Sequence, residues 1–207
     1  MLDLAFIRSA VRDKKFWAGL AGAVLLATGL VLWARRSYQH AQARDGLNTF
    51  APFENPAMDL VFPRVVLMND AARNILEAGV RERLWTLHAR GGNPPAMEVR
   101  LTDGGQRWFS VVNNQIIATF KGGTREATQV LELEEIFPSR RVRFRYYWKQ
   151  FQTASAVLGE GLPEIGKEYE GEALFFYEND QWRLMHWSTP EFDAAVEQFK
   201  LLEPAPQ

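Results

Sequence analysis

The chain of 207 residues contains no cysteine, which excludes disulfide bonds, thiolate metal sites and a catalytic cysteine. It also lacks a glycine-rich phosphate loop, a His-x-x-x-His pair and a Gly-x-Ser-x-Gly elbow. The short acidic run of Glu132, Glu134 and Glu135 is more typical of a solvated face than of a metal site. We therefore expect no catalytic residue, no cofactor and no metal, in a protein that is not an enzyme.

Positive charge is also scarce in most of the chain. The formal net charge is -1, but six basic residues flank one apolar run, and residues 37–207 carry 18 basic against 23 acidic residues. Because nucleic-acid affinity rests on neutralising phosphates, a mildly acidic domain is poorly suited to that partner. We therefore expect no nucleic-acid partner.

One long apolar run lies near the N-terminus. Phe16–Ala34 reads FWAGLAGAVLLATGLVLWA, 19 residues without a charge, and spans about 28 Å as a helix, close to the thickness of a hydrocarbon core. Trp17 and Trp33 lie at its two ends, where indole rings favour the membrane interface. The run predicts one transmembrane helix, with the lipid bilayer as a partner.

A cleaved signal peptide is the alternative, because Ala41-Gln42-Ala43 resembles a cleavage site. This site lies beyond Arg35 and Arg36, far from the apolar run, so we expect the helix to be retained. Lys and Arg are slightly more frequent before the helix than after it, which favours a cytoplasmic N-terminus. In a bacterium this would give a single-pass inner-membrane protein with its soluble domain in the periplasm.

Small residues recur on one face of this helix at Gly19, Ala23 and Ala27. Such a face lets the backbone of a second helix approach closely, although small residues are common in membrane helices anyway. The sequence leaves open whether the helix packs against other membrane subunits, including a second copy of itself.

The chain divides by composition into four parts: an N-terminal tail (1–15), the transmembrane helix (16–34), a stalk rich in turn residues (35–63) and a soluble domain (64–207). In the domain, Asn69 caps a predicted helix that continues to Arg90, and Thr124–Ile136 is rich in helix formers and is predicted to be a second helix. The segments MEVRL, RWFSVV and QIIATF between them read as strands, and a capping box at Ser188–Glu191 opens a final helix.

Long antiparallel strands follow the second predicted helix. Arg141–Gln150 alternates an apolar face with a face of arginines, and Glu168, Glu170 and Glu172 alternate with the same period. This pattern favours a cross-strand charge ladder over an RNA-stacking face. The turn at Asn179-Asp180 predicts that Tyr177 pairs with Trp182, Phe175 with Leu184, and Ala173 with His186. The order of elements predicts an α+β domain in which helices pack on a curved antiparallel sheet.

The segment Gly171–Pro190, GEALFFYENDQWRLMHWSTP, resembles the closing hairpin of the nuclear transport factor two-like superfamily, in its association-domain and polyketide-cyclase-like members. The layout of one transmembrane helix and one soluble domain is similar to that of inner-membrane scaffold subunits of type IV secretion machines. Their terminal Asn-Pro-Leu-Gly signature is not present in this sequence. The resemblance implies a cone-shaped cavity inside the sheet and pairing of subunits through its outer face.

Two faces of the predicted hairpin are candidate sites. His186 shares the parity of Tyr177 and Trp182, so these three could line the implied cavity, although a histidine hydrogen-bonded within the core is the plainer interpretation. The opposite face is also apolar, which indicates either a protein interface or cover by the C-terminal helix or the stalk. The residues of this second face are Leu174, Phe176, Met185 and Trp187.

Taken together, the sequence predicts a membrane-anchored scaffold or assembly subunit of a membrane protein complex, secretion-type or similar. It would act through protein contacts of its helix and its domain. The alternative is a membrane-tethered domain that binds a small apolar ligand near His186, with or without catalysis.

Overall fold

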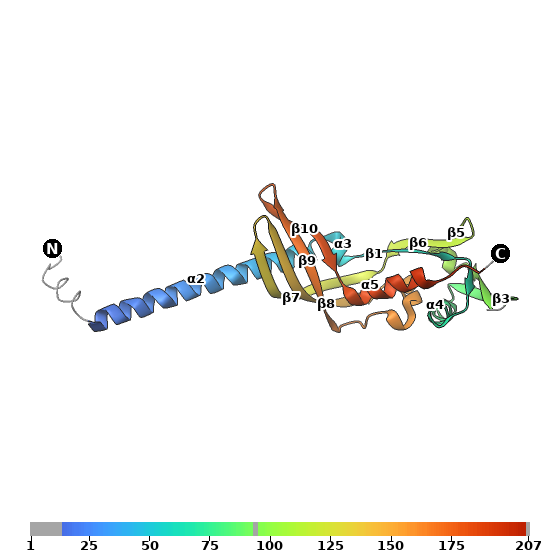
Figure 1. The fold of residues 1–207 in the computed structure, drawn as a ribbon, viewed down its shortest axis with the longest axis horizontal. Helices are drawn as coiled ribbons and strands as arrows, with labels where there is room; N and C mark the ends of the chain where they lie inside the picture. Colours follow the sequence, from blue (N-terminus) through green and yellow to red (C-terminus); the bar gives the residue numbers. More distant parts are fainter. Residues whose placement is uncertain (1–13, 93–94, 206–207) are drawn as a thin grey trace. The chain divides into compact units, whose positions relative to one another are not determined.

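The computed structural model describes residues 14–92 and 95–205, so most of the tail expected over residues 1–15 lies outside the described residues. The chain divides into two compact units, Met1–Gln42 and Ala43–Gln207. The second unit is an α+β fold that contains three antiparallel sheets (Figure 1). The sequence led us to expect one sheet, but the strands form three separate sheets.

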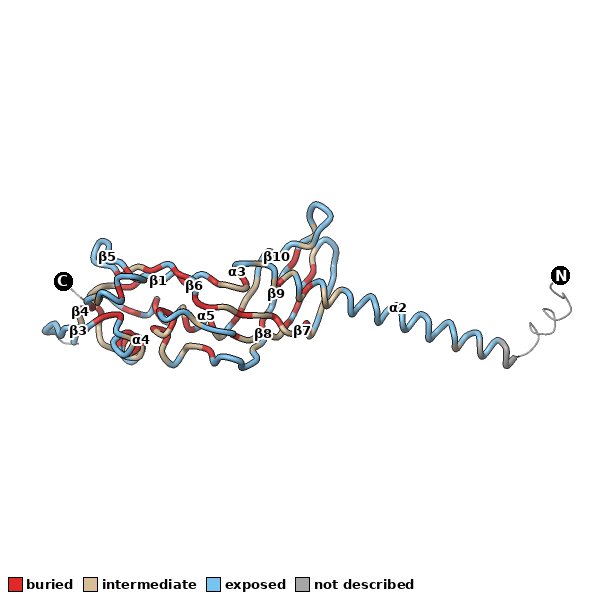
Figure 2. The backbone as a smooth tube through the Cα atoms, turned by 180° about the vertical axis from the view of Figure 1, so that it is seen from behind, coloured by how far each residue is buried: buried red, intermediate tan, exposed pale blue. Residues whose placement is uncertain are grey.

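The first unit contains most of the long helix α2, which runs from Lys14 to Asn48. This helix is long and apolar enough to cross a membrane, and its side chains between Val24 and Tyr38 are exposed to solvent (Figure 2). A helix that is apolar all round and not covered by protein is suited to a lipid environment. The expectation of an N-terminal helix of membrane-spanning length is confirmed.

The predicted stalk over residues 35–63 is wrong. Helix α2 continues through its first part, and a short helix α3, Ala51–Glu54, and a strand β1, Ala57–Pro63, make up much of the rest. Leu47, Phe53 and Met58 are completely buried in the core of the second unit. The prolines and turn dipeptides of this segment therefore separate short regular elements, and the folded unit begins about 20 residues before the predicted boundary, at Ala43.

Two small sheets lie at one end of the second unit. One has the strand order β1-β6-β5 and the other β2-β4-β3. Arg64 joins the two sheets, because it alone separates β1 from β2. The other strands of these sheets are β2 (Val65–Leu67), β3 (Trp85–Arg90), β4 (Ala96–Leu101), β5 (Ser110–Val112) and β6 (Gln115–Lys121), with a 3-10 turn, η1 (Gly105–Arg107), before β5.

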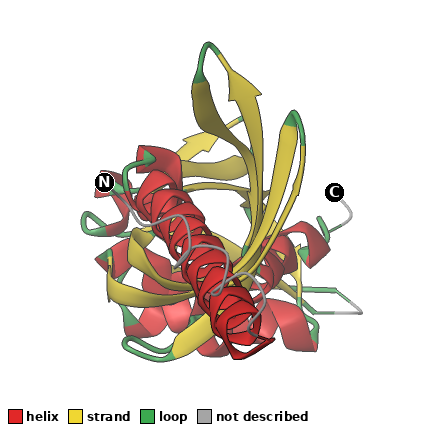
Figure 3. Cartoon of the chain, turned by 90° about the vertical axis from the view of Figure 1, so that its left-hand side faces the viewer, coloured by secondary structure: helices red, strands yellow, loops and turns green. Residues whose placement is uncertain are grey.

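The third sheet is the largest and has the order β10-β9-β8-β7. Its two hairpins lie side by side, because β8 also pairs with β9 (Figure 3). The prediction of a helix over Thr124–Ile136 is wrong, because this segment belongs to strand β7, which is paired along its whole length with β8. The strands are β7 (Gly123–Ile136), β8 (Ser139–Phe151), β9 (Glu168–Glu178) and β10 (Gln181–Ser188).

Helix α4 runs from Asp70 to Arg81, and the side chain of Asn69 accepts a hydrogen bond from the amide of Ala72, so the predicted cap is confirmed. The predicted continuation to Arg90 is wrong, since the chain turns back at Leu84 and forms β3. Gly79 faces the indole of Trp85, and a Cβ atom there would lie 2.0 Å from that ring. A glycine at this position of the helix admits the close approach of the ring.

The C-terminal helix α5, Pro190–Glu197, begins one residue later than the predicted capping box indicates, because Thr189 is its N-cap. The carboxylate of Asp193 accepts a hydrogen bond of 2.8 Å from the amide of Thr189. A 3-10 turn, η3 (Gln198–Leu201), extends α5, and another, η2 (Thr153–Gly161), connects β8 to the loop before β9. These elements and the three sheets enclose one continuous hydrophobic core.

Candidate functional site

The large sheet has one face in the core and one face in solvent. On β8 the side chains of Val142, Phe144, Tyr146 and Trp148 are fully buried, as the alternation predicted. Burial raises the pKa of the Tyr146 hydroxyl far above its ordinary value, and its neighbour Glu191, which accepts its hydrogen bond at 3.0 Å, acts in the same direction. The Tyr146 hydroxyl is therefore a fixed donor between β8 and α5 and does not titrate near neutral pH.

The outer face of the sheet carries the charge ladder that the sequence predicts. Arg143 lies opposite Glu172 and Arg145 opposite Glu170, whereas Glu168 lies opposite Tyr147. Two of the three glutamates of the predicted ladder therefore lie directly opposite an arginine. Glu168 instead lies diagonally from Arg145, at 3.9 Å.

Strand β7 extends the ladder on the other side of β8. Glu132 contacts Arg143 at 3.0 Å, and Glu126 accepts hydrogen bonds from Lys149 at 2.7 Å and from the Tyr147 hydroxyl at 3.1 Å. The hydrogen bonds from Lys149 and Tyr147 lower the pKa of Glu126. Arg143 thus has acidic partners on both neighbouring strands, Arg145 has them on β9, and Lys149 has one on β7. These ion pairs leave few basic side chains for phosphate contacts.

Toward the β7–β8 and β9–β10 turns, the same face of the sheet becomes apolar. Leu174 and Phe176 on β9 are 39% and 42% exposed, and Met185 on β10 is 62% exposed. Ser139 lies opposite both Phe176 and Ile136, so the end of β7 adds Ile136, which is 66% exposed, to the same face. The ring of Phe137, in the adjoining turn, packs against Tyr177 on the other face. We call Ile136, Leu174, Phe176 and Met185 the apolar patch. Leu174, Phe176 and Met185 are exposed, so the predicted alternative of cover by the C-terminal helix or the stalk does not apply to them. It does apply to Trp187, which packs against Phe50.

A β-bulge at Met185 changes the predicted parity of β10. Tyr177 pairs with Trp182 and Phe175 with Leu184, as predicted, but beyond Leu184 the register shifts, so that His186 lies opposite Leu174 and Trp187 opposite Ala173. The extra residue exchanges the faces of the two side chains. His186 is exposed on the outer face, and Trp187 packs inward against the ring of Phe50, with ring centroids 5.5 Å apart. The assignments of His186 to an inner cavity and of Trp187 to the outer interface are wrong.

Tyr177 and Trp182 belong to a packed cluster. Their ring centroids are 5.3 Å apart, and the guanidinium of Arg140 lies 4.0 Å from the Trp182 ring. Arg140 is 3% exposed and forms an ion pair of 2.7 Å with Glu135. Phe137 contacts Tyr177 from the neighbouring turn, with centroids 5.6 Å apart. This cluster ties the two hairpin ends together and supports the apolar patch. The sequence showed the aromatic residues but not the arginine that joins them.

The predicted membrane residues belong to the other unit. Gly19, Ala23 and Ala27 lie within α2, and Ala23 and Ala27 are exposed. Trp17 and Trp33 are 49% and 70% exposed. The exposure of Ala23, Ala27 and Trp33 is as expected of side chains that face lipid or a partner helix.

Within residues 14–92 and 95–205, no group of three or more His, Asp or Glu side chains could hold a metal ion. The cavities described are lined by residues other than His186, Tyr177 and Trp182. No protein-family model, curated protein or solved structure matches the chain significantly. Its function must therefore be inferred from its own surfaces.

Proposed function

We propose that this chain is a non-enzymatic, membrane-anchored assembly subunit whose folded unit binds another membrane protein subunit through the apolar patch. The observation that carries the proposal is the exposure of four large apolar side chains on one face of one sheet: Ile136, Leu174, Phe176 and Met185. Monomeric soluble proteins rarely leave such a contiguous surface in water, and it commonly marks a protein contact.

The surroundings of the apolar patch have the composition of an interface rim. The charge ladder begins directly beside it, because Arg141 lies opposite Leu174. Stable interfaces combine an apolar centre with a polar and charged border that fixes register. The two hairpin ends are held by the buried Arg140, so the surface is preorganised and little conformational entropy would be lost on binding.

The helix α2 would supply the location. We place its apolar run in a bilayer, in a bacterium the inner membrane, with the folded unit in the periplasm. Only the eight residues 35–42 separate Ala34 from Ala43, the first residue of the folded unit. They can span at most about 28 Å when fully extended. The folded unit would therefore remain close to the membrane surface, where a partner in the same membrane is within reach. The face of Gly19, Ala23 and Ala27 would offer that partner, or a second copy, a further contact.

The resemblance to the nuclear transport factor two-like superfamily remains a prediction. It rests on the sequence of the β9–β10 hairpin, Gly171–Pro190, with its polar turn. The scaffold subunits of secretion machines remain the nearest analogy for the layout, and a secretion-type complex is accordingly the kind of assembly that we propose. We do not retain the alternative of a ligand cavity at His186, because this side chain is exposed on the outer face of the sheet.

The proposal is tested with the full chain, extracted from its native membrane in a mild detergent. We expect it to run with at least one co-purifying chain or as a multimer. The variants Leu174→Glu and Met185→Glu should abolish this association without loss of the folded unit, because both side chains are exposed. Val61→Glu, at an exposed valine on β1, is the matched control and should retain it. A lone monomer, or a complex that tolerates both charged variants, would refute the proposal.

A further inference from the structure

A cluster of three arginines surrounds one acid on the small sheet β2-β4-β3, well apart in sequence from the apolar patch. Glu98 lies on the central strand β4 and is 4% exposed. Its Oε1 atom accepts a hydrogen bond of 2.8 Å from Arg64, and its Oε2 atom accepts hydrogen bonds of 2.8 Å from Arg90 and 3.2 Å from Arg100. Among the described residues, no other acid forms an ion pair with these three arginines.

This cluster therefore carries an excess of positive charge. The hydrogen bonds from Arg100 and Arg90 lower the pKa of Glu98 to about 2, so that the carboxylate is ionised at neutral pH. One negative charge then faces three guanidinium groups, which leaves two positive charges without an acidic partner. Such a local excess attracts anions from solution.

Arg64 has unused hydrogen-bonding capacity. Its Nε atom is buried and has no hydrogen-bond partner within the described chain, although its Nη2 atom is bound to Glu98. Its backbone is fixed on both sides, because its amide donates to the carbonyl of Asn114 and its own carbonyl accepts from Val99. A buried N–H without an acceptor is costly, and a carboxylate is an acceptor that fits a guanidinium edge.

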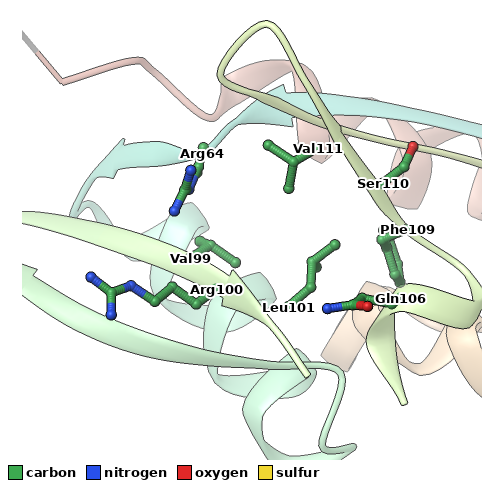
Figure 4. Close-up of a pocket in the computed structure, with 8 residues that line it drawn as sticks. All are labelled: Arg64, Val99, Arg100, Leu101, Gln106, Phe109, Ser110 and Val111. Carbon is green, nitrogen blue, oxygen red and sulfur yellow. The ribbon is translucent and has the colours of Figure 1, made fainter. Parts of the chain in front are cut away.

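A cavity of about 520 Å³ lies beside this arginine. Figure 4 shows Arg64 at one side, Phe109 and Gln106 at the other, and Leu101 and Val111 pointing into the space between from opposite strands. The side chain of Arg100 extends away from the cavity (Figure 4). Its positive charge would therefore act on a ligand at a distance and without direct contact. The volume is within the range of small-molecule sites, which combine apolar walls with a few placed polar groups.

We propose that this cavity binds a small organic carboxylate with an apolar body. The carboxylate accepts hydrogen bonds from Arg64, and the positive excess around Glu98 favours its charge. The apolar body lies against Val99, Leu101, Phe109 and Val111. A ligand without the carboxylate forgoes the charge-assisted hydrogen bond, and one without the apolar body forgoes the contacts with the wall.

The test uses the full chain in detergent, with phenylacetate as the probe and phenylacetamide as its uncharged counterpart of nearly the same shape. Binding is measured by calorimetric titration and by the rise of the melting temperature with ligand concentration. We expect phenylacetate to bind at least about tenfold more tightly than phenylacetamide, since a charge-assisted hydrogen bond contributes about 1.5 kcal/mol or more. Acetate and inorganic phosphate should bind more weakly than phenylacetate.

Variants identify the site. Arg64→Gln should weaken phenylacetate binding about tenfold or more, and Arg107→Gln, at an exposed arginine of η1, should leave it unchanged. If Arg64→Gln fails to fold, Val111→Asp provides the same test, because Val111 is 43% exposed and a carboxylate there would repel the ligand. Equal affinity for acid and amide, equal affinity for acetate or phosphate, absence of phenylacetate binding, or binding that survives Val111→Asp would each overturn the proposal.

Discussion

The Nε atom of Arg125 donates a hydrogen bond of 2.6 Å to the carbonyl oxygen of Phe53, which lies on the short helix α3. The guanidinium is also stacked over the Phe53 ring, 4.5 Å from its centroid, and its Nη1 atom donates to the hydroxyl of Thr189 at 2.8 Å. Burial lowers the pKa of Arg125 to about 10, so it is still charged at neutral pH. One side chain of β7 thus joins the segment after the long helix to the start of α5.

Replacement of this arginine by methionine should destabilise the folded unit. Arg125→Met retains a flexible apolar stem but leaves the Phe53 carbonyl and the Thr189 hydroxyl without their donor. We expect a loss of about 2–4 kcal/mol in the free energy of unfolding, since each unpaired buried polar group costs about 1–3 kcal/mol. Thermal unfolding followed by tryptophan fluorescence measures it, with Arg107→Met as the exposed control. A variant as stable as the wild type would mean that the desolvation of the charge offsets its hydrogen bonds.

A methyl group added at position 79 should destabilise the folded unit about as much as Arg125→Met does. Gly79→Ala would place a Cβ atom 2.0 Å from the Trp85 ring, whose indole nitrogen is itself held by a hydrogen bond of 2.9 Å to the Leu76 carbonyl. The ring cannot yield without loss of that bond, so we expect a destabilisation of at least about 2 kcal/mol. Gly91→Ala is the matched control, because nothing lies within 4 Å of its added carbon. If both variants unfold at the same temperature, the close packing of Trp85 does not contribute as described.

The same contact explains one of the two segments that were predicted as helix and are strand. The residues after Arg81 have the apolar spacing of a helix, yet Trp85 turns back onto Gly79 and begins strand β3. The other error, over Thr124–Ile136, has a similar origin. Helix formers there are paired with the arginines of β8, for example Glu132 with Arg143. Long-range pairing overrode local propensity in both segments, and propensity is only a weak prior.

The hairpin of β9 and β10 shows where local signals suffice. Asn179 and Asp180 adopt the positive φ angles of 51° and 60° that a tight turn requires, and the two nearest pairs follow as predicted. The bulge at Met185 has no local signal of this kind, since no glycine or proline marks it. One inserted residue was enough to move His186 out of, and Trp187 into, the interior. The apolar patch itself was predictable for Leu174, Phe176 and Met185, but not for the turn at Ile136, which was assigned to a helix.

Acid should act on the folded unit partly through Glu98. Its pKa is lowered from 4.5 to about 2 in the folded state, so it contributes stability above its ordinary pKa, and this contribution is lost as the pH falls from about 4.5 to 2. The variant Glu98→Gln should be less stable at neutral pH and should lose less stability over that interval. Melting temperatures at a series of pH values measure the difference, with Glu134→Gln as the exposed control. Parallel curves for wild type and Glu98→Gln would contradict the role of the three arginines.

The boundary of the folded unit at Ala43 predicts which shortened chains fold and which remain in the membrane. A chain that begins at Ala43 should be soluble without detergent and keep the melting temperature of the full chain, because it lacks the apolar run but retains Leu47, Phe53 and Met58 in the core. A chain that begins at Arg64 loses these side chains and strand β1, and it should not fold. Each missing large core side chain costs about 2–5 kcal/mol, and a domain of this size has a total stability of only about 5–15 kcal/mol.

Circular dichroism shows whether each shortened chain folds, and its partition between membrane and soluble fractions shows whether it is anchored. If the chain from Arg64 folded as well as the chain from Ala43, residues 43–63 would be a stalk after all, and their burial would contribute no stability. If the chain from Ala43 still sedimented with membranes, the anchoring would not depend on α2. The apolar patch would then become the candidate membrane-binding surface, since it is the large exposed apolar surface that this shorter chain retains.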